Sequence, residues 1–240
     1  MNLEIYSFKE LKKMAIRMDL PIKKSKADII SIIEPALQEY ENYKKEKLDK
    51  YAKIGKLGEK GKEGTVYLVE DKNRNQYAMK TFNSKKSSNS IRRESNMQDI
   101  AASFNVSPNI IEIDTVSNYI VMEKLDNTLI DIMIKQNKEL TKTQQLQIIG
   151  IFKKLDEAGV LHGDPNPLNF MKKGKRLYII DFGFARKIDD KIIKKYGSNP
   201  NIKLMTLGLI LKLKDLGCPR TSYIFMLDFI SDRKIKKFNL

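Results

Sequence analysis

Residues 161–170 read LHGDPNPLNF, and residues 179–185 read IIDFGFA. The first stretch carries Asp164 and Asn169, and the second carries Asp181, seventeen residues after Asp164. Carboxylate and amide oxygens are the ligands that Mg²⁺ prefers in proteins, and a second carboxylate beside such an ion can orient a nucleophile. The spacing therefore predicts two acidic loops that meet at one metal–phosphate centre.

Two prolines define the path of the first loop. Pro165 and Pro167 lie between Asp164 and Asn169. A proline ring fixes φ and disfavours a helical conformation at the preceding residue, so the chain here is expected to be extended. Both polar side chains then point towards the same centre.

Segments upstream supply groups that suit a phosphate. Residues 57–69, LGEKGKEGTVYLV, place Gly58, Gly61 and Gly64 between two predicted strands. Glycine allows backbone N–H groups to approach phosphate oxygens, although glycine-rich hairpins are also common without a ligand. Lys80 follows in the apolar strand QYAMKTF, where an inward ammonium requires an anion. Together with the acidic loops, these groups predict a magnesium–triphosphate site.

Residues 53–186 resemble the catalytic domain of the protein-kinase-like superfamily. Lys80 matches the lysine of V-A-I-K, HGDPNPLN matches H-R-D-x-x-x-x-N, and Asp181 begins D-F-G. The resemblance implies that Lys80 holds the α- and β-phosphates of ATP and that Asp164 is the catalytic base. It also implies that Asn169 and Asp181 bind Mg²⁺.

The same resemblance implies the other contacts of ATP. Glu94, in RRESNMQDIAA, is the candidate acid that pairs with the catalytic lysine, and VMEKL falls at the hinge that holds adenine through its backbone. His162, the only histidine, is interpreted as a buried residue that is hydrogen-bonded to the backbone. The residues expected around ATP are Leu57, Gly58, Gly61, Gly64, Val66, Ala78, Lys80, Glu94, Glu123 and Leu125.

The chain also departs from the protein-kinase pattern. Gly163 replaces the arginine of H-R-D, no A-P-E follows D-F-G, and residues 181–197 contain neither Ser nor Thr. We therefore expect a reduced C-terminal lobe and no switch based on phosphorylation of an activation loop. These departures resemble the compact RIO-like and tRNA-modification-associated kinases and the reduced kinases of large DNA viruses. HGDPNPLN is also similar to the H-G-D-x-x-x-x-N motif of aminoglycoside and choline kinases.

The expected fold is α+β: a bilobal protein-kinase-like domain preceded by a small helical hairpin. Apolar alternation predicts strands at 65–71, 76–82 and 117–125, and helical periodicity predicts a long helix at 141–159. The polar run SKKSSNS, residues 84–90, predicts a mobile loop.

The first forty residues predict the hairpin. SFKE and SKAD both match the helix-start signal S-x-x-E/D, and Leu20-Pro21 interrupts the helical pattern between them. The stretch resembles the SAP domain, a DNA-binding module, with Asp19 where that family usually has Gly. A hairpin that simply packs on the main domain is the alternative. The expected domains are a SAP-like module at 1–38, a charged helical linker at 39–52 and a kinase domain at 53–240.

The charge of the chain favours a phosphate-rich partner. The formal net charge is +15, and residues 171–240 contain 17 Lys and Arg against 6 Asp and Glu. Duplex DNA bound by residues 1–38 and by this basic C-terminal third is the expected partner, beside a protein substrate. The ratio of 37 Lys to 8 Arg is also typical of an A+T-rich genome, so part of the charge can reflect codon usage on a solvated surface.

Cysteine content and hydropathy limit the location. Cys218 is the single cysteine, which fits a reducing intracellular compartment. No apolar run reaches the roughly 20 residues that a transmembrane helix needs, and no membrane partner is expected. A viral origin would place the protein in the host cytoplasm or nucleus, or in the virion.

Three functions are compatible with these patterns. The leading hypothesis is an ATP- and Mg²⁺-dependent Ser/Thr protein kinase that associates with DNA. The alternatives are a small-molecule phosphotransferase and an inactive DNA-binding adaptor. The short segment after D-F-G argues against the former, and the intact Lys80, Asp164, Asn169 and Asp181 argue against the latter.

Overall fold

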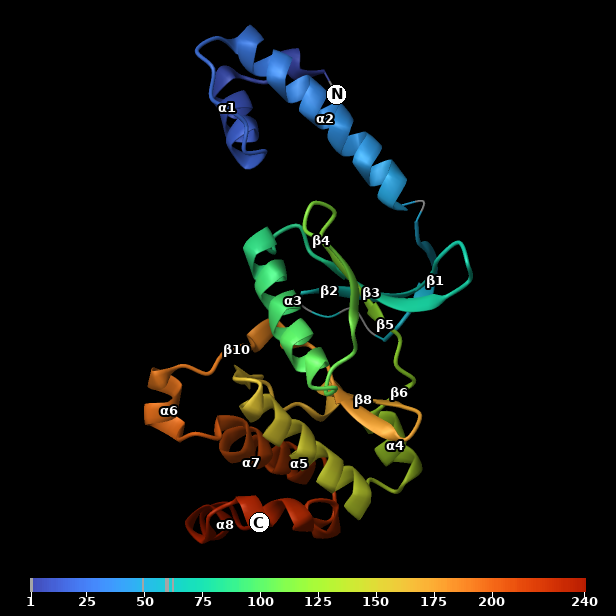
Figure 1. Ribbon diagram of the computed structural model, residues 1–240, viewed down its shortest axis with the longest axis vertical. Helices are drawn as coiled ribbons and strands as arrows, with labels where there is room; N and C mark the ends of the chain where they lie inside the picture. The colour runs from blue at the N-terminus through green and yellow to red at the C-terminus, as the bar shows by residue number, and fades with distance from the viewer. Residues whose placement is uncertain (1, 49, 59–60, 62) are drawn as a thin grey trace. The chain divides into compact units, whose positions relative to one another are not determined.

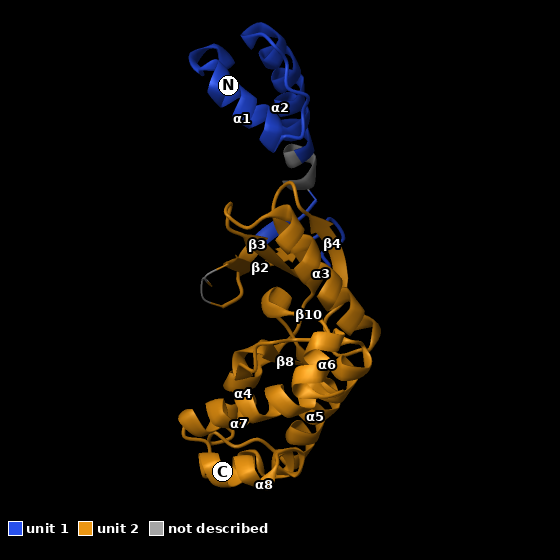
Figure 2. Cartoon of the chain, turned by 90° about the vertical axis from the view of Figure 1, so that its left-hand side faces the viewer, with its two compact units in different colours: residues 1–53, 70–75 blue, residues 54–69, 76–240 orange. Residues whose placement is uncertain are grey.

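The computed structural model describes residues 2–48, 50–58, 61 and 63–240. Asp49 of the expected linker and residues 59–60 and 62 of the glycine-rich segment lie outside the described residues. The chain forms two compact units, drawn in different colours in Figure 2, which comprise residues 1–53 with 70–75 and residues 54–69 with 76–240.

The N-terminal residues form the predicted helical hairpin (Figure 1). A short 3₁₀ turn, η1 (Leu3–Ile5), precedes α1 (Phe8–Arg17) and α2 (Lys26–Leu48). Ser7 and Glu10 form a reciprocal capping box at the start of α1, as the sequence signal predicts. The hairpin has its own apolar core, whose buried members are Leu3, Leu11, Ala15, Ile29, Ile30 and Ile33.

The turn between the two helices forms despite the absence of glycine. Asp19 adopts a φ of 55°, the left-handed conformation that glycine favours at a helix C-terminus and that Asp tolerates better than most residues. The second helix then continues past residue 38 to Leu48, so the charged stretch predicted as a linker extends α2 rather than following it.

A five-stranded antiparallel sheet lies in the second unit, apart from the first two residues of β1 and the last residue of β2. Its strand order is β1-β2-β3-β5-β4, with β3 and β5 paired in a register that places Lys80 opposite Ile120. The sheet strands are β1 (Ala52–Lys56), β2 (Gly64–Glu70), β3 (Gln76–Phe82), β4 (Ile110–Asp114) and β5 (Tyr119–Glu123). Helix α3 (Ser88–Ser103) packs on β4 (Figure 1).

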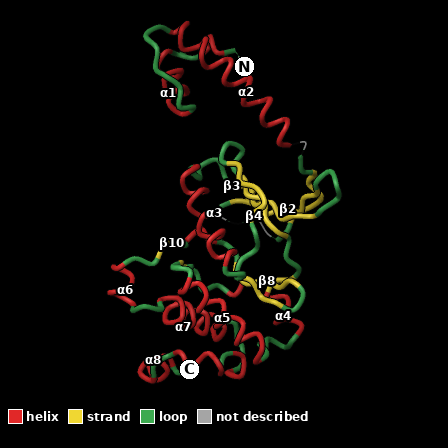
Figure 3. Tube along the Cα trace, in the orientation of Figure 1, coloured by secondary structure: helices red, strands yellow, loops and turns green. Residues whose placement is uncertain are grey.

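The rest of this unit is mainly helical, as the secondary-structure colours of Figure 3 show. Its helices and turns are α4 (Leu129–Lys135), α5 (Lys142–Glu157), η2 (Pro167–Asn169), η3 (Phe182–Phe184), α6 (Asp190–Tyr196), η4 (Asn201–Met205), α7 (Thr206–Asp215), η5 (Arg220–Ser222), η6 (Ile224–Phe229) and α8 (Asp232–Phe238). Its strands are β6 (Asn127–Thr128), β7 (Val160–Leu161), β8 (Phe170–Lys173), β9 (Arg176–Ile179) and β10 (Arg186–Lys187).

The core of the helical part surrounds α5. Thr141 caps this helix, and its inward face buries Ile148, Phe152 and Leu155. Strand β8 pairs with β9, and Phe170 on β8 meets Phe152 edge to face at 5.9 Å between ring centroids. This packing fixes the strands on either side of the two acidic loops. The predicted mixed helix-and-sheet fold is therefore present.

The prediction of a mobile loop at residues 84–90 is wrong for residues 88–90, which are helical, while residues 84–87 form a turn. Ser87 is the N-cap of α3, where its hydroxyl accepts a hydrogen bond from the N–H of Ser90, and residues 88–90 form the first turn. Ser-rich sequence is ambiguous because serine favours both loops and helix N-caps. Here the helix N-cap is favoured, because Lys86, just before α3, forms an ion pair with Glu94 on α3.

Within the described residues, every helix is too short or too polar to span a lipid bilayer.

Candidate active site

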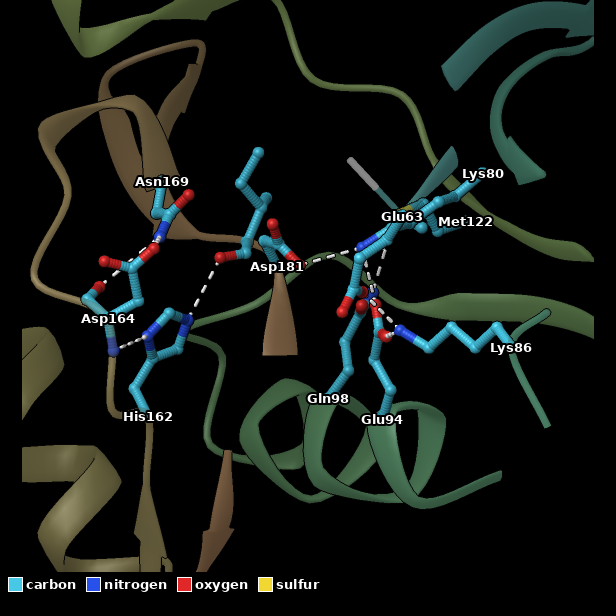
Figure 4. Close-up of polar contacts among 11 residues, drawn as sticks. Glu63, Lys80, Lys86, Glu94, Gln98, Met122, His162, Asp164, Asn169 and Asp181 are labelled. Carbon is cyan, nitrogen blue, oxygen red and sulfur yellow. Dashed lines mark hydrogen bonds and ion pairs between the residues drawn. The ribbon is translucent and has the colours of Figure 1, made fainter. Parts of the chain in front are cut away.

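Lys80 lies at the centre of the candidate site (Figure 4). Its Nζ is 2.6 Å from Oε1 of Glu94 on α3 and 2.8 Å from Oδ1 of Asp181 at the start of η3. Its side chain is 13% exposed and that of Glu94 is 2% exposed, so this ion pair is largely screened from water, whereas the Asp181 side chain is 47% exposed. The structure thus brings together three residues that lie far apart in the sequence and that the sequence analysis assigned to one site.

Glu94 uses both of its carboxylate oxygens. Oε1 accepts from Lys80, and Oε2 accepts from Lys86 at 2.6 Å, while the Glu94 side chain is only 2% exposed. Lys86 also pairs with Glu63 from the glycine-rich segment. A chain of alternating charges therefore runs from Asp181 to Glu63, and the sequence analysis did not anticipate its second half.

Opposite charges set the protonation states at Lys80 and Asp181. Burial alone lowers the pKa of Lys80, but the carboxylates of Glu94 and Asp181 outweigh it and raise this pKa above its ordinary value. Burial alone raises the pKa of Asp181, but the ammonium of Lys80 outweighs it and lowers this pKa. Lys80 is therefore a cation and Asp181 an anion at neutral pH.

The loop from Asp164 to Asn169 is closed by a direct side-chain bond. Nδ2 of Asn169 donates to Oδ2 of Asp164 at 2.8 Å, and the backbone N–H of Asn169 donates to the carbonyl of Asn166 at 2.9 Å. Asn166 is extended and Pro167 starts the turn η2, so the predicted extended path ends one residue before the second proline. The amide N–H groups of Asn169 are thus engaged with Asp164, and its amide oxygen is the atom that could bind a cation.

Asp181 lies between the two polar pairs. In Figure 4 it separates the Asp164–Asn169 pair from the Lys80–Glu94 pair. Its φ is 65°, a left-handed conformation that non-glycine residues rarely adopt and that is concentrated at functional sites. The backbone at Ile180 and Phe182 holds this conformation, because Ile180 N–H bonds Asn169 and Phe182 is fully buried.

His162 has the structural role that the sequence predicts. It is completely buried, its Nε2 lies 3.0 Å from the carbonyl oxygen of Ile180, and its Nδ1 lies 3.4 Å from the N–H of Asp164. These partners require a neutral ring that is protonated on Nε2. Its ring also contacts Phe182 edge to face. The histidine therefore ties the two acidic loops together, and burial lowers its pKa.

This histidine should make stability depend on pH near neutrality. The unfolded chain takes up a proton on His162 below about pH 6.5, whereas the folded chain, with its lowered pKa, does not. The unfolded state then binds more protons, so the unfolding free energy should fall as pH drops from 7 to 5, by up to about 1.4 kcal/mol per pH unit. Urea denaturation across this range should show the slope, and His162→Gln should flatten it. Equal slopes in both proteins would contradict this account.

The structure explains why glycine replaces arginine at position 163. Gly163 has a φ of 86°, and a Cβ built there would lie 2.9 Å from the carbonyl oxygen of Phe184. Any other residue would be strained and would push against the backbone that follows Asp181. The two acidic loops are therefore packed too closely for an arginine at this position.

Gly163→Ala should lower the unfolding free energy by about 1–3 kcal/mol, since a left-handed alanine is strained and meets the Phe184 carbonyl. Gly150→Ala is the matched control, because Gly150 lies within α5 and a Cβ there meets nothing within 4 Å. That variant should be more stable by roughly 0.5–1 kcal/mol. Urea denaturation of both variants tests the pair, and a neutral Gly163→Ala would contradict the interpretation.

The residues expected around adenine are partly brought together. Leu57 and Val66 pack against a buried cluster that contains Ala78 and Met122. Leu125 is also buried. Met122 was not predicted as a site residue, although its place in the apolar strand β5 was the available signal.

The expected hinge residue Glu123 makes two further contacts, through its N–H and its side chain, which leave its backbone carbonyl out. Its backbone N–H donates to the carbonyl of Asn109 at 2.9 Å, and its carboxylate pairs with Lys173. The ammonium of Lys173 lowers the pKa of Glu123. In this structure the hinge is therefore joined to strand β8 through side chains, which the sequence analysis did not predict.

Binding of phosphate is not the reason for every glycine of the glycine-rich segment. A Cβ at Gly64 would lie 1.9 Å from the carbonyl oxygen of Thr81, so glycine is needed there for β2 to approach β3. Gly58 has a φ of 78° and open space around it, and Gly61 lies close to the carbonyl of Gly64. Gly58 and Gly61 are thus the positions that a ligand could approach.

A second network of hydrogen bonds holds the backbone just before the Asp164 loop. Asn201, at the start of η4, accepts a hydrogen bond from the N–H of His162 at 3.1 Å and donates to the Val160 carbonyl at 2.8 Å. Asp156 on α5 binds the backbone and side-chain N–H groups of Asn201 at 2.8 Å. Burial raises the pKa of Asp156. Sequence spacing could not reveal this network, because Asn201 lies 39 residues from His162.

The donor set suits a hard cation shared with a phosphate ligand. Among the described residues, no three His, Cys, Asp or Glu side chains gather to form a metal site. Mg²⁺, however, commonly takes one or two protein oxygens and completes its shell with phosphate oxygens and water. Asn169 and Asp181 supply an amide and a carboxylate oxygen of this kind.

Comparison with known proteins gives one family match. The family model described as "Protein kinase domain" matches residues 51–200. The KEOPS complex subunit Bud32 of Pyrococcus abyssi is 28% identical over 127 residues, which cover 52% of this chain and 57% of that protein. A protein of Acanthamoeba polyphaga mimivirus, provisionally named a serine/threonine-protein kinase, is 31% identical over 150 residues, which cover 57% of this chain and 27% of the relative.

A third relative is similar over a shorter stretch. A BUD32 homologue of Archaeoglobus fulgidus, also provisionally named a serine/threonine-protein kinase, is 32% identical over 79 residues, or 32% of this chain and 37% of the relative. The aligned part of these relatives is thus between 27% and 57% of their own lengths.

Proposed function

The chain belongs to the protein kinase domain family, and from this premise we propose that it transfers the γ-phosphate of ATP to serine or threonine hydroxyls of proteins. The observation that carries the proposal is the convergence of Lys80, Glu94 and Asp181 beside the Asp164–Asn169 pair. Each of these residues has the chemical type that its position in the family's motifs requires.

Each residue has a distinct role in the proposed reaction. Asp164 accepts the proton of the attacking hydroxyl, and its carboxylate is oriented by the 2.8 Å bond from Asn169. Lys80, held as a cation, binds the phosphates of ATP. Asn169 and Asp181 would hold Mg²⁺, which neutralises charge on the phosphates when it is bound. Glu94 positions Lys80.

The apolar wall next to these charges suits the adenine ring. Leu57, Val66 and Ala78 belong to or pack against one cluster of the five-stranded sheet. A flat apolar base fits such a surface, and the phosphates of ATP would then lie towards Lys80. Gly58 and Gly61 would approach those phosphates through their backbone.

Incubation with radiolabelled ATP and Mg²⁺ tests the proposal. Basic and acidic generic proteins serve as acceptors, with aminoglycosides and choline in parallel. We expect label on serine or threonine of a protein and none on the small molecules. Label on the small molecules alone would support a phosphotransferase instead, and no transfer to any acceptor would count against the proposal.

We further propose that the protein associates with duplex DNA through a module at residues 1–38, joined by residues 39–52 to the catalytic domain at 53–240. The module's turn carries Lys23 and Lys24, both exposed, and its resemblance to the SAP domain supports the assignment. The basic C-terminal third offers further cations.

Lys23→Gln combined with Lys24→Gln should weaken duplex DNA binding. Each lysine that contacts a phosphate contributes about 0.9 to the slope of log affinity against log salt, so the slope should shrink by up to about 2. Fluorescence anisotropy of labelled DNA over a salt series measures it. Lys72→Gln combined with Lys135→Gln removes the same charge from exposed positions outside residues 1–38 and serves as the control. Equal slopes in both double variants would exclude the turn as a DNA contact.

A further inference from the structure

Lys86 and Glu63 belong to the charged cluster around Lys80 but have no part in the reaction proposed above. Nζ of Lys86 lies 2.6 Å from Oε2 of Glu94 and also pairs with the carboxylate of Glu63 (Figure 4). The Lys86 side chain is only 12% exposed. A cation that is largely removed from water is costly unless anions surround it. Any change in the site that moves one of these two carboxylates therefore requires another anion beside Lys86.

Lys86 lies next to the lysine that is proposed to bind the phosphates. The two oxygens of the Glu94 carboxylate accept from Lys80 and from Lys86 respectively. Both ammonium groups also lie over the ring of Phe82, with Nζ at 5.3 Å from the ring centroid for Lys80 and at 4.6 Å for Lys86. The two cations are thus side by side. A chain of phosphates that reaches Lys80 is also within reach of Lys86.

The carboxylate of Glu63 lies where it would repel such phosphates. A Cβ built at Gly183 would be 3.0 Å from Oε2 of Glu63 and 3.5 Å from Oδ1 of Asp181, so the two carboxylates approach the same point. Asp181 is the residue proposed to hold Mg²⁺ with its phosphates, and two anions repel each other there.

Glu63 is able to leave this position through its side chain alone. The side chain is 45% exposed, so its carboxylate returns to water with a small loss of ion-pair energy. The backbone stays in place, because the Glu63 carbonyl accepts a hydrogen bond from the N–H of Asn83 at 2.9 Å. Lys86, in contrast, remains buried and then needs a replacement for the lost carboxylate.

We propose that Lys86 is a second phosphate-binding cation of the ATP site and exchanges the carboxylate of Glu63 for a phosphate oxygen. This inference rests on the proposed function, because it requires ATP at Lys80. An ammonium group has three donors, so Lys86 keeps its bond to Glu94 while it binds the phosphate. The exchange leaves the buried cation paired before and after ATP binds.

The exchange differs from a structural ion pair in the sign of its effects. Lys86→Gln removes the cation that the phosphate binds, whereas Glu63→Gln removes the anion with which the phosphate competes. Both substitutions break the same ion pair. A pair that only stabilises the fold would make both variants lose ATP affinity in the same direction. The proposal instead requires opposite shifts.

Titration calorimetry on the full-length protein with Mg²⁺ tests the proposal. The probes are the β,γ-imido analogue of ATP, whose terminal phosphate is not transferred, and adenosine, which has no phosphate. Lys86→Gln should weaken binding of the ATP analogue about tenfold, because a charge-assisted contact is lost. Glu63→Gln should strengthen it about threefold, because a repelling charge is removed. Neither substitution should change the affinity for adenosine.

Two matched controls remove the same charges from exposed positions. Lys85→Gln changes the neighbouring lysine, and Asp99→Asn changes a carboxylate on α3. Both should bind the ATP analogue as the wild type does. Thermal midpoints show whether each variant is folded, and Glu63→Gln decides the question even if Lys86→Gln does not fold.

The outcomes separate this inference from the proposed function. Binding of the ATP analogue by the wild type with unchanged affinity in Glu63→Gln, or with weaker affinity in both variants, would overturn the role of Lys86 alone. Equal shifts for adenosine would overturn it as well, because the effect would not depend on phosphate. A wild-type protein that does not bind the ATP analogue would refute the proposed function and this inference together.

Discussion

Asp181→Asn should lower the rate of phosphoryl transfer roughly 10³-fold, and Asp164→Asn should have an effect of similar size. Asp181 loses the negative charge proposed to hold Mg²⁺, and Asp164 loses the ability to accept a proton. Neither change should unfold the protein. The Asp181 side chain is 47% exposed, and Asn tolerates the left-handed backbone found there.

Initial rates in the ATP assay measure the effect, and thermal midpoints by circular dichroism show whether the fold is retained. Asp215→Asn is the matched control, because Asp215 is an exposed residue at the end of α7. It should leave the rate unchanged. A folded Asp181→Asn protein with the wild-type rate would refute the assignment of Asp181, and the same result for Asp164 would refute a catalytic base there.

The two acidic loops could be predicted from the sequence because their structure is largely local. Pro165 and Pro167 restrict the backbone over a few residues, and the bond between Asp164 and Asn169 joins residues only five apart. His162 could be predicted for the same reason, since its partners belong to these two loops. Short-range steric rules suffice for such contacts.

The contacts that support the site from a distance could not be predicted. Lys86 resembles many other lysines of the chain, and only the folded structure places it between Glu94 and Glu63. Asn201 reaches His162 across 39 residues, and the pairing depends on how α5 and η4 pack. No periodicity or spacing rule encodes such contacts, because tertiary packing determines them.

Local signals also competed with one another at element boundaries. Ser87 could belong to a polar loop or cap a helix, and the ion pair between Lys86 and Glu94 favours the helix. The charged stretch after residue 38 has good helix formers, so α2 continues through it although Pro35 lies within the same helix. The approximate positions of the helices and strands along the chain were therefore predicted better than the residues at which they begin and end.

Glu94→Gln should have the second large effect, on both stability and activity. Glu94 is 2% exposed and is the shared counter-charge of Lys80 and Lys86, whose side chains are 13% and 12% exposed. Removing one partner of a buried ion pair typically costs about 3 kcal/mol or more of unfolding free energy, because the remaining charges stay desolvated. Urea denaturation measures this loss, and Glu157→Gln, on the exposed side of α5, is the control that should be neutral.

The rate of phosphoryl transfer by Glu94→Gln should also fall, roughly 10²-fold, for a separate reason. Without the Glu94 carboxylate, Asp181 is the remaining carboxylate partner of Lys80 at this site. Lys80 should then shift away from the phosphates. A second substitution distinguishes the two effects. Adding Lys86→Met to Glu94→Gln removes the surplus positive charge, so part of the lost stability should return. The rate should stay low, because nothing restores the position of Lys80. If the double variant recovered its rate along with its stability, Glu94 would act only as a counter-charge, and the positioning role proposed for it would be wrong.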